Sequence, residues 1–91
     1  MPETSGGLIH ISSAVVRCLP AWVGAVRGAI DAMDAAEVVH AEGNKLIVII
    51  EGASSGAVGA CLTRIAAHEG VVSAAMVYEQ IEPFESLGEQ A

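Results

Sequence analysis

The sequence has few of the residues that mark a metal site, a disulfide framework or a nucleic-acid interface. It has only two cysteines, Cys18 and Cys61, and they lie far apart, while its three histidines are scattered, so no metal-ligand spacing appears. Four basic residues stand against eleven acidic ones, and the formal charge of -7 argues against nucleic acid, whose phosphates bind basic patches. The glycines form neither of the common phosphate-binding motifs. From these absences we expect no metal, no cofactor and no nucleic-acid partner.

Long apolar runs are also absent. No stretch approaches the roughly 20 apolar residues that a membrane-spanning helix needs. Residues 1–7 lack the charged start and apolar core of a secretory signal. These features predict a cytoplasmic protein without stable membrane insertion.

The length and composition predict a single domain. Ninety-one residues, 53% of them apolar, are enough for one modest core. With few aromatic residues, that core must be mainly aliphatic. We expect the domain to cover residues 8–82, with flexible tails at 1–7 and 83–91.

The most apolar stretch runs from Lys45 to Gly52 and predicts a strand at the centre of a sheet. It is short, rich in β-branched residues and bounded by turn residues. Side chains of a strand alternate between two faces, and here both faces are apolar, so both need a cover. One face carries Leu46, Val48 and Ile50, and the other carries Ile47 and Ile49.

The remaining elements predict the ferredoxin-like split βαβ fold, of the α+β class. The order is strand, helix, strand, strand, helix, strand, which gives a four-stranded antiparallel sheet with both helices on one face. The strands should lie in the order fourth, first, third, second, which puts the two apolar strands in the centre. The other strands are expected over 8–19, 37–42 and 71–81, and the helices over 21–34 and from Ser54 or Ser55 to the residues before Gly70.

Alternation divides the strands into a helix-facing side and an open side. The helix-facing set is Ala14, Val16, Cys18, Leu46, Val48, Ile50, Val72, Ala74 and Met76. The open side carries Ile11, Ser13, Val15, Arg17, Val39, Ile47, Ile49, Ser73, Ala75 and Val77. A solvated sheet face is normally polar, whereas a large apolar one marks an interaction site. The residues alone leave open whether a second copy of the chain or a foreign partner covers this face.

Three segments resemble the NapD family, which are cytoplasmic chaperones of the periplasmic nitrate reductase catalytic subunit. They are Ile-Ser-Ser-Ala-Val-Val-Arg at 11–17, Leu-Ile-Val-Ile-Ile-Glu at 46–51, and His-Glu-Gly-Val-Val-Ser-Ala-Ala-Met-Val-Tyr at 68–78. The family often has a histidine after that last tyrosine, where this chain has Glu79.

The resemblance implies a non-enzymatic chaperone without a cofactor of its own. It implies binding of the twin-arginine signal peptide of the nitrate reductase precursor, which delays export until the molybdenum cofactor is inserted. We expect the peptide on the open side of the sheet, joined by Glu51 and Glu79. By alternation these two carboxylates flank Ile11 about 10 Å apart, across one intervening strand, and each can pair with an arginine.

Two other functions use the same fold. An amino-acid-sensing homodimer, similar to the ACT domain, needs a polar pocket at the helix starts or at a dimer interface. The glycine clusters offer only a weak sign of one, and a weak homodimer remains open. An acylphosphatase-like hydrolase needs an arginine and an asparagine after the first strand, where this chain has Leu19, Pro20 and Ala21.

Overall fold

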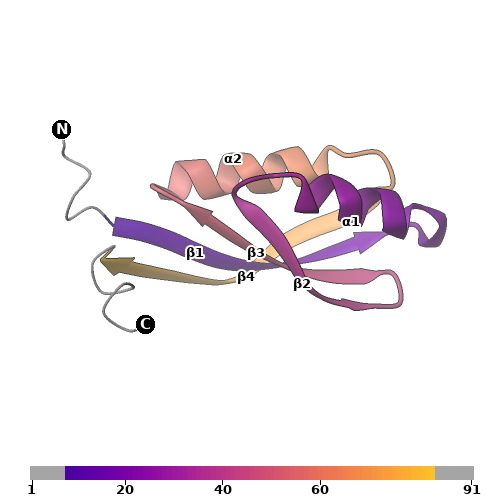
Figure 1. Ribbon diagram of the computed structural model, residues 1–91, viewed down its shortest axis with the longest axis horizontal. Coiled ribbons are helices and arrows are strands. Elements are labelled where there is room, and N and C mark those ends of the chain that lie inside the picture. Colours follow the sequence, from indigo (N-terminus) through magenta and orange to yellow (C-terminus); the bar gives the residue numbers. More distant parts are fainter. Residues whose placement is uncertain (1–7, 84–91) are drawn as a thin grey trace.

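Four strands form one antiparallel sheet, and two helices lie together on one side of it (Figure 1). The computed structural model describes residues 8–83. In chain order the elements are β1 (Leu8–Cys18), a 3-10 turn (Pro20–Trp22), α1 (Val23–Asp31), β2 (Ala36–Glu42), β3 (Lys45–Gly52), α2 (Ser55–Ala66) and β4 (Val71–Pro83). No helix in this range is long and apolar enough to cross a membrane.

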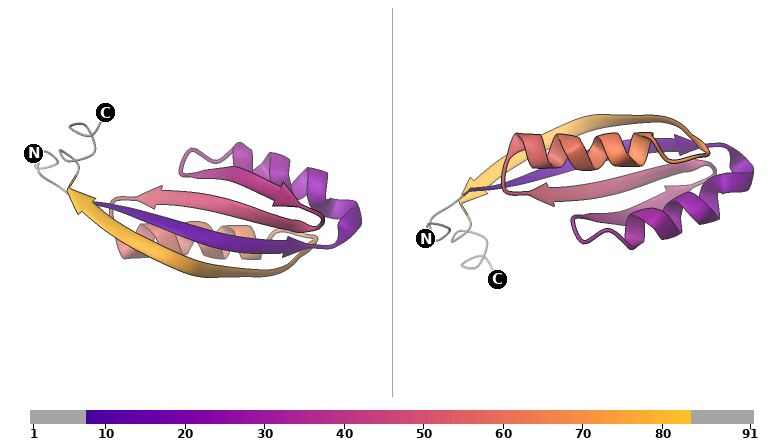
Figure 2. Two further views of the ribbon diagram at one scale, coloured as in Figure 1. Left: turned by 90° about the horizontal axis from the view of Figure 1, so that it is seen from below. Right: turned by 90° about the horizontal axis from the view of Figure 1, so that it is seen from above.

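The strand order is β2-β3-β1-β4, which confirms the predicted ferredoxin-like topology. All neighbouring strands are antiparallel. The two strands with apolar residues on both faces, β1 and β3, are the central pair. Seen from one side the sheet is uncovered, and seen from the other the helices lie in front of it (Figure 2).

The core lies between the sheet and the helices and is aliphatic. The sheet contributes the even-numbered residues of β1 and β3, and each helix contributes one stripe. The buried apolar residues are Ala14, Val16, Cys18, Val26, Ile30, Ala36, Val38, Leu46, Val48, Ile50, Val58, Cys61 and Ile65. The predicted helix-facing sets of β1 and β3 are therefore confirmed.

The second helix and the hairpin start as their residues predict. The Ser54 hydroxyl accepts a hydrogen bond from the Ala57 N–H at 3.0 Å, which caps the first turn of α2. Gly43 takes the left-handed conformation (φ 59°) that a two-residue hairpin turn requires. Asn44 ties this turn to the end of β1, since its side-chain amide donates to the Cys18 carbonyl at 2.9 Å.

The first helix is shorter than the predicted range 21–34. Its start is a 3-10 turn at Pro20–Trp22, because no side chain caps the free N–H groups there. Its end is set by Asp31, whose carboxylate accepts a hydrogen bond from the Val38 N–H at 3.2 Å. The chain therefore leaves the helix early and turns into β2.

Both edge strands contain extra residues that interrupt the alternation. The register shifts leave Val39 of β2, and Val72 and Val77 of β4, without a paired residue in the neighbouring strand. A bulge residue of this kind moves the following side chains to the opposite face. The prediction for Val72 is wrong for this reason, because it is 63% exposed and Val71 packs on the core instead.

The C-terminal strand is longer than predicted. It ends at Pro83, whereas the sequence places residue 83 in a tail. The rest of the predicted tails, residues 1–7 and 84–91, lies outside the described residues.

Neighbouring substitutions on β3 test which face the helices cover. Val48 is fully buried, so an aspartate there leaves an unpaired buried charge that costs several kcal/mol, and we expect Val48→Asp to unfold the protein. Ile49→Asp should stay folded, because Ile49 points to the open side. Circular dichroism distinguishes the two. A folded Val48→Asp beside an unfolded Ile49→Asp would invert the faces. Met76, predicted to behave like Val48, is 37% exposed and should tolerate the change better.

Two glycines should respond to alanine in opposite directions. A Cβ at Gly28, in the exposed part of α1, meets nothing within 4 Å, so Gly28→Ala should stabilise the protein by up to about 1 kcal/mol. A Cβ at Gly70 would overlap the ring of Trp22, and Gly70 has φ 92°, so Gly70→Ala should destabilise by at least about 1 kcal/mol. Urea unfolding midpoints measure both. Equal shifts of the same sign would contradict this account.

The hydroxyl of Ser12 is buried without a hydrogen-bond partner within the described part of the chain. Burying an unpaired hydroxyl costs free energy, so Ser12→Ala should stabilise the protein by about 1 kcal/mol. Ser13→Ala is the matched control, because Ser13 is partly exposed on the other face and should change stability by less than about 0.5 kcal/mol. A destabilised Ser12→Ala would show that the hydroxyl has a partner in solution.

Candidate functional site

The side of the sheet away from the helices, called here the open face, carries apolar side chains that no other described element covers (Figure 2). On β1 and β3 the structure confirms the predicted membership. Their even-numbered residues from Ser12 to Cys18 and from Leu46 to Ile50 are buried, and the residues between them are partly or fully exposed. The open-face residues of these two strands are Ile11, Ser13, Val15, Arg17, Ile47, Ile49 and Glu51.

The register brings these residues into direct pairs across the two central strands. Ile11 lies opposite Glu51, Val15 opposite Ile47, and Arg17 opposite Lys45. Such pairs have Cβ atoms about 5 Å apart, so the aliphatic side chains form one continuous surface. Charged residues stand at its two ends.

On β2 the bulge at Val39 changes which residues join the open face. Val39, the predicted member, is the extra residue and is 50% exposed. The register places Glu37 opposite Ile49 and His40 opposite Ile47. Simple alternation assigns Glu37 correctly but misses His40, and nothing in the sequence of the strand marks the bulge.

On β4 the predicted members Ser73 and Ala75 pair with Arg17 and Val15 of the open face. Val77 is the extra residue of the second bulge and is 60% exposed. The register then places Tyr78 opposite Ser13, and Tyr78 is also 60% exposed. Tyr78 was missed by alternation, and the adjacent large apolar residues Val77 and Tyr78 are the only sign of it in the sequence.

The same bulge removes the basis for the predicted pair of Glu51 and Glu79. Alternation through Val77 predicts Glu79 on the open face, but the register pairs Glu79 with Ser12, which is buried on the helix side. The β4 residue opposite Ile11 is Gln80. The side chains of residues 79–83 lie outside the described part, so Glu51 alone keeps its predicted place beside Ile11.

A different group of carboxylates gathers near Glu51. Asp34, Glu37 and Glu51 line a hollow of about 230 Å³ together with Ile49. The Glu51 N–H donates to the Ala35 carbonyl at 2.9 Å, which holds the end of β3 against the turn that carries Asp34. This acidic hollow adjoins the aliphatic part of the open face, because Glu37 and Ile49 are paired residues.

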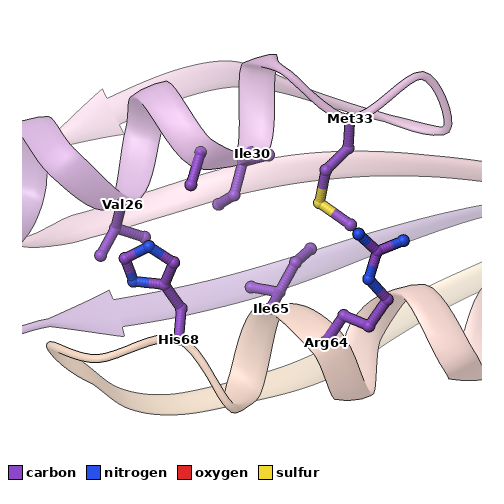
Figure 3. Close-up of a pocket in the computed structure, with 7 residues that line it drawn as sticks. Val26, Ile30, Met33, Arg64, Ile65 and His68 are labelled. Carbon is purple, nitrogen blue, oxygen red and sulfur yellow. The ribbon is translucent and has the colours of Figure 1, made fainter.

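A small apolar pocket lies on the other side of the molecule, between the helices (Figure 3). Val26, Ile30 and Met33 face Arg64, Ile65 and His68 across a volume of about 130 Å³. The pocket lies at the last turns of the helices and not at their starts. It therefore differs from the polar ligand pocket that an amino-acid-sensing module requires.

The two cysteines are packing residues. Both are buried, and burial raises the pKa of each thiol above its ordinary value, with Arg64 partly opposing the rise at Cys61. A raised pKa keeps the sulfur in the unreactive thiol form. Among residues 8–83 no cluster of histidine, cysteine, aspartate or glutamate is suited to hold a metal ion.

Comparison with known proteins places the chain in a family. The model of the NapD protein family matches residues 9–83. The chain is 35% identical over 86 residues to the chaperone NapD of Paracoccus pantotrophus, covering 91% of this chain and 77% of that protein. It resembles the solution structure of the E. coli Tat proofreading chaperone protein NapD with a TM-score of 0.75, at 22% identity, over 82% of this chain and 81% of that one. Both relatives are named as chaperones, a non-enzymatic role. This chain belongs to the NapD family.

Proposed function

We propose that this protein is a cytoplasmic chaperone that binds the twin-arginine signal peptide of the precursor of the periplasmic nitrate reductase catalytic subunit. Binding delays export of the precursor until its molybdenum cofactor has been inserted. The proposal draws on membership of the NapD family and on one structural observation, the apolar open face.

The composition of the open face suits the apolar stretch of a signal peptide. The described central strands present isoleucine and valine where a solvated sheet face would carry polar residues. Fully burying one such side chain contributes about 1.5–3 kcal/mol. A pair of exposed opposite charges contributes at most about 1 kcal/mol, so apolar contacts should supply most of the affinity.

The charge of the protein suits the arginines of the same peptide. The chain carries a formal charge of -7, which attracts a cationic segment and speeds its association. This attraction weakens as salt rises. The two features together distinguish a twin-arginine signal from an ordinary apolar segment.

The first test is calorimetric titration of the full chain with a synthetic twin-arginine signal peptide. We expect binding that weakens when the two arginines are separated in a scrambled peptide of the same composition. Titration with free amino acids serves as the control for a small-molecule sensor. Equal binding of both peptides would contradict specific recognition, and binding of an amino acid alone would favour the sensing module.

Two alanine substitutions locate the binding surface. Ala75 is exposed on β4 opposite Val15 of the open face, and Ala60 is exposed on α2 on the helix side. We expect Ala75→Arg to weaken peptide binding about tenfold, because a bulky cation then lies under an apolar, cationic peptide. Ala60→Arg adds the same group on the opposite side and should leave affinity unchanged.

The result is interpretable only if both variants fold, which circular dichroism checks. Loss of binding in Ala60→Arg with normal binding in Ala75→Arg would move the site to the helices. Sedimentation of the free protein at increasing concentration tests the remaining occupant of the open face, a second copy. A stable dimer that the peptide does not dissociate would contradict the proposal.

A further inference from the structure

We propose that the signal peptide lies on the open face in one direction, parallel to β1. Its two arginines lie at the start of β1, and its apolar stretch extends toward Arg17 and Lys45. This inference rests on the proposed function, because it takes the open face as the binding surface. It follows from the charges at the two ends of that face, which differ in sign.

The end of the open face where β1 begins is acidic. Glu51 lies opposite Ile11, and Glu37 lies opposite Ile49 on the next strand. With Asp34 they line the hollow of about 230 Å³, and all three residues are exposed. None of the three carboxylates forms an ion pair with another described residue. A guanidinium group can form two hydrogen bonds to one carboxylate, which makes arginine the natural partner for this end.

The opposite end, where β1 finishes, is basic. Arg17 and Lys45 are paired residues on the two central strands, and both belong to the open face. Glu42 of β2 lies opposite Lys45 and is the carboxylate that the register places nearest to them among the described residues. Two cations against one carboxylate leave this end unfavourable for a further pair of arginines.

The distance between the ends suits the apolar part of such a peptide. Lys45 and Glu51 are six residues apart on one strand, which corresponds to about 20 Å. About 13 residues in a helix, or about six in an extended chain, cover that length. The surface between the ends is aliphatic and includes Val15, Ile47 and Ile49.

The order of parts in the peptide then determines its direction. An export signal has its charged residues first and its apolar run after them. With the arginines in the acidic hollow, the apolar run crosses the aliphatic surface toward Arg17. The reverse direction brings the arginines next to Arg17 and Lys45, where like charges repel, and leaves the hollow empty of cations.

Paramagnetic NMR on the full chain tests the direction. A synthetic peptide of two arginines followed by about 13 apolar residues carries a nitroxide at its N-terminus or, in a second sample, at its C-terminus. We expect the N-terminal label to broaden the amide signals of Ile11, Glu37 and Glu51. The C-terminal label should broaden those of Arg17 and Lys45.

Two glutamates of β2 provide a matched pair of variants. Both are exposed on the open face, Glu37 at its acidic end and Glu42 at its basic end. Glu37→Gln should weaken binding up to about fivefold at low salt and less at high salt. Glu42→Gln removes the same charge at the other end and should leave affinity unchanged.

The outcomes separate this inference from the proposed function. Binding with the opposite broadening pattern, or with both labels broadening both ends equally, overturns the direction and leaves peptide binding intact. A larger effect of Glu42→Gln than of Glu37→Gln also overturns it. Absence of any binding to the unlabelled peptide overturns the proposed function, and this inference with it.

Discussion

The structure depends on one imbalance, that the two central strands are apolar on both faces while the chain has helices for only one. Val16, Leu46, Val48 and Ile50 are fully buried under α1 and α2. The residues between them carry the same kinds of side chain but lack a described cover. Burial of apolar surface is the main force that stabilises the fold, so the uncovered face retains a free energy that a partner can gain. The binding surface is a consequence of how the small core is built.

The edge strands limit what can happen at the sides of this sheet. Unpaired N–H and C=O groups at an edge can pair with another chain and cause aggregation. Here both edges contain bulges, at Val39 in β2 and at Val72 and Val77 in β4. A bulge disrupts the ladder and increases its twist, which discourages edge-to-edge pairing. The bulges thus favour association through the face over association through the edges, and they also bring His40 and Tyr78 onto that face.

Charge divides the open face without dividing its apolar surface. The acidic hollow at Asp34, Glu37 and Glu51 depends on three elements, since the turn before β2, β2 itself and the end of β3 each contribute one residue. The pair Arg17 and Lys45 depends on the register between β1 and β3. Apolar contact provides affinity but no direction, whereas charges at the two ends provide direction at little cost in affinity.

The sequence by itself determined the order of the elements, the topology and the two faces of β1 and β3. These follow from local rules, because side chains alternate strictly in an uninterrupted strand and turn residues mark its ends. Ser54 and Gly43 are positioned by such rules, and the structure confirms both. Only the tertiary structure decided the places of Val39, Val72 and Glu79. A bulge arises from pairing with the neighbouring strand, and one extra residue reverses every later assignment. The acidic hollow was likewise beyond the sequence, because Asp34 and Glu51 meet only when the Glu51 N–H bonds to the Ala35 carbonyl across the fold.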